Sequence, residues 1–435
     1  MTLHAPSRTA SPDRDRAGPL REALAGRYRA CRALTERLSA PLGAEDQQLQ
    51  SMPECSPTKW HRAHTTWFFE TFVLAPQGVA PWHEAFGFLF NSYYEAAGPR
   101  HERPRRGLVS RPDVQTVGAY RRAVDERLLE LLERCSDATL ADLAPVIELG
   151  IAHEQQHQEL ILSDILHAFS LNPLQPAYRG AALLPEAGDT PGPLQWTGHL
   201  GGAVEIGHAG EGFAFDNEGP RHCVWLQPFA LANRLITVGE LKAFINDGGY
   251  RTPSLWLSDG IDWVRREGIE APGHARLDGG ELLVFGLEGP RVASDDEPAA
   301  HLSFYEADAI ATWMDARLPT EAEWEVVAAR ADPGAPGLDD PGGDPLHPLP
   351  AQGSALQQLQ GCLWQWTRSA YAPYPGYRPA AGALGEYNGK FMANQFVLRG
   401  GSFATPAGHV RIGYRNFWAP ATRFQFSGLR LAKDL

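Results

Sequence analysis

Apolar positions recur every three or four residues through the first 170 positions of the chain. This spacing predicts amphipathic helices over residues 19–42, 57–74, 113–135 and 143–169, because residues so spaced share one helix face. The second helix is signalled by Ser56 followed by Pro57, a capping residue and a proline suited to the first helical turn. Four such helices predict a four-helix bundle, in which metal sites are built from inward-facing side chains of different helices.

The pattern changes in the second half to short apolar runs separated by turns, with helices predicted only at 237–247 and 303–316. Short strands with much irregular backbone predict an α+β domain. We therefore divide the chain into a disordered leader (1–18), a metal-binding four-helix bundle (19–171), a linker rich in Pro, Gly and Ala (172–195) and an α+β domain (196–435).

The composition disfavours several classes of function. A formal net charge of −13 over 435 residues argues against nucleic-acid binding, which needs a basic face. No apolar run reaches the roughly 18 residues of a membrane span, and the polar leader lacks the hydrophobic core of a signal peptide. The five cysteines are scattered without a C-x-x-C pair, which is typical of reduced thiols. We expect a cytoplasmic protein that acts on small molecules, without nucleic-acid or membrane partners.

Residues 153–157 (HEQQH) lie in a stretch that contains neither proline nor glycine from 151 to 170. On a helix, His153 and His157 sit one turn apart on one face, so both imidazoles can reach a single metal ion. A lone buried histidine is usually a hydrogen-bonded core residue. A one-turn pair inside an apolar helix favours a metal site.

The same residues match H-E-x-x-H, the pattern of zinc proteases, in which Glu154 would be the general base. That alternative needs a third ligand downstream of His157. The nearest histidine there is His167, which lies about 80° around the helix and almost three turns along it from His157 and fits poorly.

His64 is a candidate third ligand from the second predicted helix. It shares the apolar face of that helix with Trp60, Trp67 and Phe68 and so points into the bundle, whereas His61 flanks it. The alternative interpretation of His64 is a hydrogen-bonded core histidine.

A loop after this helix joins an aromatic run to an arginine-rich segment, residues 100–111. Tyr93 and Tyr94 in the aromatic run need hydroxyl partners. The loop is either a hydrophobic lid with solvated arginines or a binding site for a small anionic ligand.

The second half resembles the formylglycine-generating-enzyme-like fold, a C-type-lectin-like module. DNEGPRH (216–222), HLSFYEA (301–307), RLPTEAEWE (317–325) and LRGGS (398–402) carry this resemblance. The paired copper-binding cysteines of true formylglycine-generating enzymes have no counterpart, because no cysteine follows Cys362. That family's own chemistry is therefore not expected.

The first half resembles DinB-like metal bundles, and both halves together resemble the ergothioneine-biosynthetic sulfoxide synthases over residues 20–433. WHRAHTTWFFE (60–70), HEQQH (153–157), GEYNGKFM (385–392) and YRNF (414–417) carry this resemblance. It implies iron(II) held by His64, His153 and His157, with O2 as co-substrate. It also implies bonding of a sulfur atom to the imidazole C2 of hercynine, the trimethylated betaine of histidine. Ligand chemistry alone does not select iron, since three histidines and a water also suit zinc.

The resemblance further implies contacts to hercynine. Gln156 would contact this substrate, and Asn416, Phe417 and Trp418 would hold its carboxylate and its cationic end. An aromatic ring near a quaternary ammonium is also expected from cation–π attraction. Glu154 would then be structural or support the ligands.

Further roles implied by the resemblance fall in the loop regions. Tyr93 or Tyr94 would donate a proton in the reaction, with Tyr377 as a second candidate acid that is more simply a packed turn residue. Arg103 or Arg106 would bind an anionic group of the sulfur donor, because a guanidinium can pair bidentately with a carboxylate.

Departures from the family pattern lie in the second half. Gln365 stands where relatives commonly have Glu, Phe403 stands where Cys is common, and Ala300 lies near another common Cys position. This pattern suits an altered second substrate and leaves two donor classes open. One is a selenosugar, as in the selenoneine synthases of the same group, and the other is cysteine or γ-glutamylcysteine.

Three alternatives remain outside this group. They are a zinc hydrolase of the H-E-x-x-H type, a DinB-type thiol transferase that uses the same three histidines without redox chemistry, and a lectin-like binding module.

Overall fold

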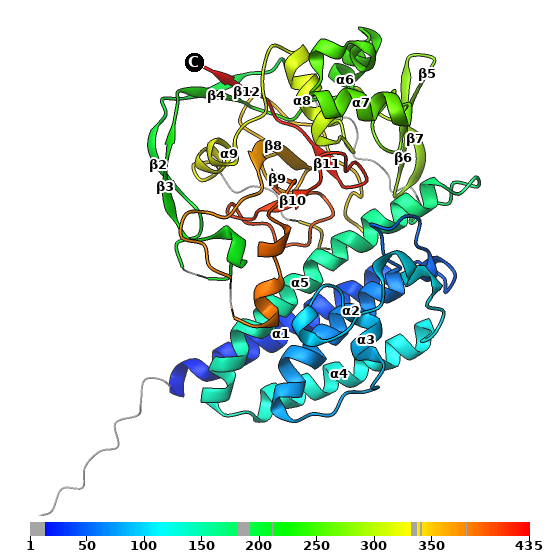
Figure 1. Cartoon of the computed structure of the whole chain (residues 1–435), viewed down its shortest axis with the longest axis vertical. Coiled ribbons are helices and arrows are strands. Elements are labelled where there is room, and N and C mark those ends of the chain that lie inside the picture. The colour runs from blue at the N-terminus through cyan, green and yellow to red at the C-terminus, as the bar shows by residue number, and fades with distance from the viewer. Residues whose placement is uncertain (1–13, 181–191, 211, 332–336, 340–341, 380) are drawn as a thin grey trace, which may run out of the picture.

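Two halves make up the computed structural model, which describes residues 14–180, 192–210, 212–331, 337–339, 342–379 and 381–435. The first is a helical bundle, and the second packs helices against several small sheets (Figure 1). The predicted fold class, an α-helical bundle followed by an α+β domain, is confirmed. Within the described ranges, no helix combines the length and the apolar character needed to cross a membrane.

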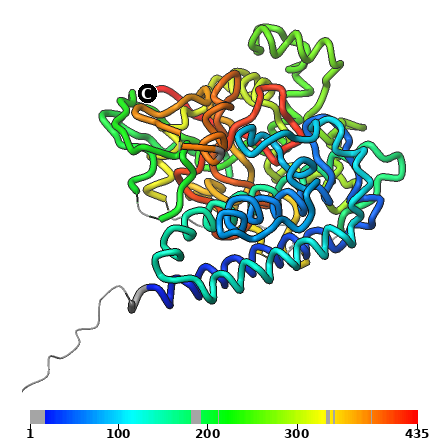
Figure 2. Tube along the Cα trace, turned by 60° about the horizontal axis from the view of Figure 1, so that its bottom comes forward, coloured from blue at the N-terminus to red at the C-terminus, as the bar shows by residue number. Residues whose placement is uncertain are grey.

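The described part of the first half contains the four predicted helices and one short addition. They are α1 (Arg14–Ser39), α2 (Thr58–Phe69), α3 (Phe86–Phe90, the addition), α4 (Val114–Arg134) and α5 (Asp137–Ser170). The long helices run side by side along one side of the molecule (Figure 2), with α5 packed on α1 and α2 and with α4 also against α2. Tyr28, Trp67, Phe68 and Tyr120 are among the buried side chains between them.

The helix ends follow local capping chemistry, with one correction. Asp113 accepts a hydrogen bond from the Thr116 N–H at the start of α4, as Ser136 does from Thr139 at the start of α5. α1 begins at Arg14, so residues 14–18 are helical and do not belong to the predicted leader, whose residues 1–13 lie outside the described residues. The predicted start at residue 19 followed from the polar character of residues 1–18 and the apolar spacing that begins at Leu20, whereas Pro19 lies inside α1.

α5 is the longest of these helices, at 34 residues, and it reaches back to Asp137 from the predicted start near residue 143. It lies between the other bundle helices and the second half (Figure 1). Gly150 permits the close approach of α5 to α2, because a Cβ at this position would lie 2.4 Å from the Phe69 ring.

Glu159 of α5 joins the two halves. Its carboxylate accepts hydrogen bonds from Trp364 Nε1 (2.7 Å), Ser402 Oγ (2.6 Å) and Thr405 Oγ1 (2.7 Å), all in the second half. All four side chains are buried. Because a buried carboxylate needs such donors, these bonds hold the second half in one position on α5.

The described part of the second half contains four small sheets. Their strand orders are β1-β4-β12, β2-β3, β5-β6-β7 and β10-β9-β8-β11, and β11 pairs with β8 in parallel while the other pairs are antiparallel. The strands are β1 (Trp196–His199), β2 (Gly202–Ile206), β3 (His222–Leu226), β4 (Phe229–Ala232), β5 (Ala275–Asp278), β6 (Glu281–Gly286), β7 (Gly289–Val292), β8 (Trp364–Ala370), β9 (Phe396–Arg399), β10 (Asn416–Trp418), β11 (Ser427–Gly428) and β12 (Ala432–Asp434).

The helices of the second half are α6 (Val238–Asn246), α7 (Ser258–Glu267), α8 (Phe304–Trp313) and α9 (Glu321–Ala328). α6 and α8 correspond to the two predicted helices, whereas α7 and α9 were not predicted. α9 begins with a capping box between Thr320 and Glu323, a signal that was present within RLPTEAEWE.

The predicted linker, 172–195, is described only up to residue 180 and from residue 192. Tyr178 in its first part is buried, and its hydroxyl donates to the Leu38 carbonyl at 2.7 Å. The described beginning of this segment therefore packs against the bundle.

Candidate metal centre

Three histidines converge between α2 and α5. His64 projects from α2, and His153 and His157 project from successive turns of α5. One nitrogen from each ring lies within 4.8 Å of the others, and the Nε2 atoms of His64 and His153 are 3.2 Å apart. In the described part of the chain, this is the one group of three or more His, Cys, Asp or Glu residues close enough to share a metal ion.

The chemistry of these three imidazoles fits a metal. Burial lowers the pKa of His153 to about 3, and burial together with the neighbouring histidines lowers the pKa values of His64 and His157 well below the usual range. The rings are therefore neutral near pH 7, so a metal does not have to displace a proton from them.

His64 is oriented before any metal binds. Its Nδ1 lies 2.6 Å from the Phe90 carbonyl, which can only accept, so the proton sits on Nδ1 and the lone pair on Nε2. The ring stacks on Trp60, with centroids 4.5 Å apart, and on Trp67, at 5.6 Å. This packing aims Nε2 at the position that His153 also faces.

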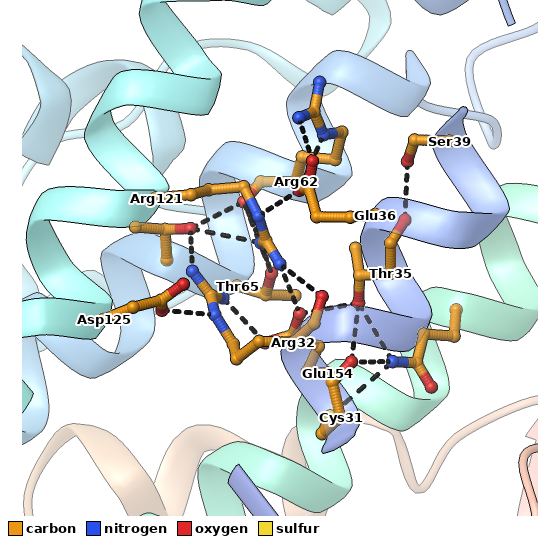
Figure 3. A network of polar contacts seen from close by, with 12 residues as sticks. Cys31, Arg32, Thr35, Glu36, Ser39, Arg62, Thr65, Arg121, Asp125 and Glu154 are labelled. Atoms are coloured by element: carbon orange, nitrogen blue, oxygen red, sulfur yellow. Dashed lines mark hydrogen bonds and ion pairs between the residues drawn. The ribbon is translucent and has the colours of Figure 1, made fainter. Parts of the chain in front are cut away.

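Glu154, the general base of the hydrolase alternative, lies in a separate network (Figure 3). Its carboxylate accepts from Thr35 Oγ1 (2.6 Å), Arg32 Nη1 (2.7 Å) and Arg121 Nη2 (2.9 Å). Burial raises the pKa of Glu154, but the two guanidinium groups outweigh this and lower it to about 2. A carboxylate held by residues of α1 and α4 in this way is a weak base. Its role is to pair with buried donors within the bundle.

The downstream ligand that a hydrolase of this type needs is also missing from the cluster. His167 Nδ1 lies 2.7 Å from Ser51 Oγ, and its ring packs near His274 and Phe424. The third histidine of the cluster is instead the upstream His64. The geometry therefore gives no support to the hydrolase.

Gln156 faces the second half from the turn of α5 between the two histidines. Its Nε2 donates to the Tyr414 hydroxyl at 2.6 Å, and its Oε1 accepts from the Tyr387 hydroxyl. The Tyr387 ring centroid lies 5.6 Å from that of His153. Tyr387 and Tyr414 had no predicted role, although both stand in motifs, GEYNGKFM and YRNF, that carry the family resemblance.

The two candidate acids of the loop lie beside Tyr387. The Tyr93 ring centroid is 4.8 Å from that of Tyr94 and 6.2 Å from that of Tyr387. Burial raises the pKa values of all three phenols, so they are protonated near neutral pH. Lys390 donates to the Tyr93 carbonyl and so ties this loop to the second half.

Tyr377, the second candidate acid, has a different environment. Its hydroxyl donates to Asp216 Oδ2 at 2.8 Å, and Asp216 Oδ1 accepts from Asn388 Nδ2 at 2.6 Å. This arrangement matches the interpretation of Tyr377 as a packed turn residue.

The two candidate arginines differ in exposure. Arg106 is 3% exposed, its guanidinium carbon lies 3.4 Å from the centroid of Trp60, and it donates to Ser56 Oγ (2.9 Å) and Ser92 Oγ (3.1 Å). Within the described residues no carboxylate is at ion-pair distance from it. Arg103 is exposed and donates to the Glu54 carbonyl.

Asn416, Phe417 and Trp418 form β10, at the edge of their sheet. The ring centroid of Phe417 lies 6.0 Å from that of Phe391, which in turn lies 5.3 Å from that of Tyr93. Trp418 Nε1 is buried and has no hydrogen-bond partner among the described residues. Phe391 therefore connects β10 to Tyr93 by ring contacts. The rings of β10 make no ring contact with the three histidines in the described structure.

A groove of about 1540 Å³ lies at the junction of the halves near the C-terminal end of α5, and none of the three histidines of the cluster lines it. It is lined by the end of α5, the β5-β6-β7 sheet and residues 421–424, among others. Two of its lining residues touch candidate site residues: Phe424 packs on Trp418 at 5.3 Å, and the Glu54 carbonyl accepts from Arg103.

Comparisons with known proteins cover both halves. Residues 198–435 match the sulfatase-modifying factor enzyme 1-like domain, and residues 27–161 match the DinB superfamily. The chain is 31% identical over 444 residues to the hercynine oxygenase of Mycobacterium tuberculosis, covering 95% of this chain and 99% of that protein. It is 32% identical over 455 residues to the hercynine oxygenase of Mycolicibacterium smegmatis, with the same coverage. The formylglycine-generating enzyme of Streptomyces coelicolor is 27% identical over 281 residues, which are 54% of this chain and 87% of that protein.

Proposed function

This chain belongs to the hercynine oxygenase family, and from that membership we propose an iron(II)- and O2-dependent synthase that bonds a sulfur or selenium donor to the imidazole C2 of hercynine. The chain is an oxidoreductase of the sulfoxide synthase type, in the pathway of ergothioneine biosynthesis. The metal, the co-substrate and the donor are the proposed part. The observation that carries it is the convergence of three neutral histidines beside residues of the second half.

His64, His153 and His157 would hold the iron. Three neutral imidazoles leave coordination positions open, and zinc would also accept such a set, so iron is proposed from the family. Bound iron(II) would supply the redox chemistry that couples O2 reduction to bond formation at carbon. Because the five cysteines are free thiols, we expect the reaction in the cytoplasm.

Hercynine would bind between Gln156 and β10. Gln156 is held at both ends of its amide by Tyr414 and Tyr387, so it presents one fixed orientation to a substrate beside the metal. Trp418 Nε1, buried and without a partner among the described residues, is a donor suited to a carboxylate. Asn416 and Phe417 would complete this contact, with aromatic faces attracting the trimethylammonium group.

The proton donor would be Tyr93 or Tyr94, whose protonated phenols suit that role. Tyr387 joins them as a third candidate, because its hydroxyl is bound to Gln156. The chain thereby offers a protonated hydroxyl next to the residue that would hold hercynine.

The sulfur or selenium donor would use the arginine loop. Arg106 is a buried cation without a carboxylate at ion-pair distance in the described chain, which supports it as the partner of an anionic group. Arg103 is exposed and donates to the carbonyl of Glu54, a residue that lines the groove, so it would meet the donor first.

Mass spectrometry of aerobic reactions tests this proposal. Fe(II)-loaded protein would receive hercynine deuterated at C2 with cysteine, γ-glutamylcysteine or a selenosugar. We expect one donor class to give an adduct that has lost the deuterium, because the C2–H bond is replaced by C–S or C–Se and O2 accepts the electrons. An adduct whose mass spectrum shows the selenium isotope pattern would identify the selenosugar as the donor. Absence of an adduct with every donor would contradict the proposal.

The substrate role of Gln156 is tested by a matched pair of variants. Gln156→Ala should reduce adduct formation at low hercynine more than Gln155→Ala, because Gln155 lies next to it on α5 but bonds His409. Equal effects of the two variants would remove Gln156 from the binding site.

A further inference from the structure

A chain of hydrogen bonds leads from His157 to a buried carboxylate. His157 Nδ1 lies 2.7 Å from His61 Nδ1, and His61 Nε2 lies 3.0 Å from Asp164 Oδ2. His61 and Asp164 are 2% and 6% exposed. His61 was predicted only to flank His64, so its hydrogen bonds to His157 and Asp164 are a finding of the structure.

The carboxylate orders the protons along the chain. A carboxylate accepts, so the proton of His61 sits on Nε2 and its Nδ1 carries a lone pair. His157 must then donate from Nδ1, which leaves the lone pair of its Nε2 for a metal. Each nitrogen and oxygen in this series of hydrogen bonds thus has one assigned role, either donor or acceptor.

The three histidines of the cluster differ in the hydrogen-bond partner of their Nδ1 atom. His64 donates from Nδ1 to the neutral Phe90 carbonyl. The Nδ1 atom of His153 has no hydrogen-bond partner among the described residues. Only His157, of the three, is connected to an anionic group. A hydrogen bond that ends on a carboxylate makes an imidazole a stronger electron donor to a metal.

We propose that His61 and Asp164 are positioning residues that fix Nε2 of His157 as the metal ligand and make His157 the strongest donor of the three. The inference rests on the proposed metal centre. Strong donation stabilises the oxidised ion over the reduced one, so the pair would lower the reduction potential of bound iron as well as tighten its binding.

Asp164 also has a structural task, which a suitable variant can preserve. Its Oδ2 accepts both His61 Nε2 and the Ser56 N–H, at 3.0 and 2.8 Å. An asparagine oxygen in the same place can accept both bonds. Asp164→Asn therefore removes the negative charge and keeps the two contacts that hold α2 against α5.

The test compares metal binding and reduction potential in the full-length protein without substrates. Asp164→Asn and His61→Gln should each weaken Fe(II) affinity by about 10- to 100-fold, as loss of a ligand's supporting partner commonly does. Both should shift the Fe(III)/Fe(II) potential to more positive values. The control is His167→Gln, which alters a histidine one turn beyond Asp164 that bonds Ser51 instead, and it should change neither quantity.

Wild-type affinity and potential in Asp164→Asn would overturn the inference. Equal shifts in the His167→Gln control would do the same, because they would reflect a general disturbance of α5. The proposed function fails in a distinguishable way, namely if the wild-type protein itself does not bind iron at the three histidines.

Discussion

Replacing His153 with alanine is expected to abolish iron binding and product formation. Two neutral imidazoles would remain of the three described side chains that are close enough together to share a metal ion. Loss of only a supporting hydrogen bond commonly weakens metal affinity about 10- to 100-fold, so loss of the ligand itself should exceed that range. Anaerobic Fe(II) titration against a competing chelator measures the affinity, and circular dichroism checks that the helices persist.

The companion variant His64→Ala separates this account from the H-E-x-x-H alternative. His64 lies 89 positions before His153 in the chain and belongs to no H-E-x-x-H pattern. The His64→Ala variant should nevertheless lose as much iron binding as His153→Ala does, while His167→Gln should bind iron normally. Retention of full iron binding by His64→Ala would remove that residue from the ligand set.

Glu154→Gln is expected to destabilise the fold and to leave iron binding intact. The substitution removes the buried carboxylate that Arg32 and Arg121 share, although Asp125 still pairs with Arg32 and Glu36 with Arg121. Breaking a buried ion pair costs about 3–5 kcal/mol, and these remaining partners place the expected cost toward the lower end of that range. The free energy of unfolding, measured by urea titration monitored by circular dichroism, should fall by that order. Iron affinity and turnover per folded molecule should stay near those of the wild type.

Glu148→Gln provides the matched control on the same helix. Glu148 pairs with Arg27, and both side chains are partly exposed, so its loss should cost less than about 1 kcal/mol. If Glu154→Gln kept wild-type stability and bound metal but lost activity, Glu154 would be a catalytic base and the structural role would be wrong.

Local spacing explains why the bundle could be predicted from the sequence. The helical periodicity of α2, α4 and α5 is unbroken, and the pairing of His153 with His157 needs only one helical turn. His64 could be added because its apolar neighbours indicated which face of the helix points into the bundle, although every residue of α2 proves to be buried. α7 and α9 were missed: α7 begins without a side-chain cap, and the capping-box signal of α9 was not recognised.

Other features of the site depend on contacts between distant segments. Asp164 meets His61 across 103 positions, and Tyr387 meets Gln156 across 231. No periodicity within one element reports such pairings. The same holds for Glu154: the H-E-x-x-H pattern offered a general base and the family resemblance a structural role, but neither identified its partners on α1 and α4.

Oxygen consumption tests the central claim most directly, namely that the three-histidine centre performs redox chemistry on two organic substrates together. Anaerobically purified protein loaded with Fe(II) would be mixed with O2 and with hercynine, a donor, or both. The account predicts rapid O2 uptake only when both are present, and none in His153→Ala. Product formation that is indifferent to O2 would contradict it and would favour a DinB-type thiol transferase using the same histidines.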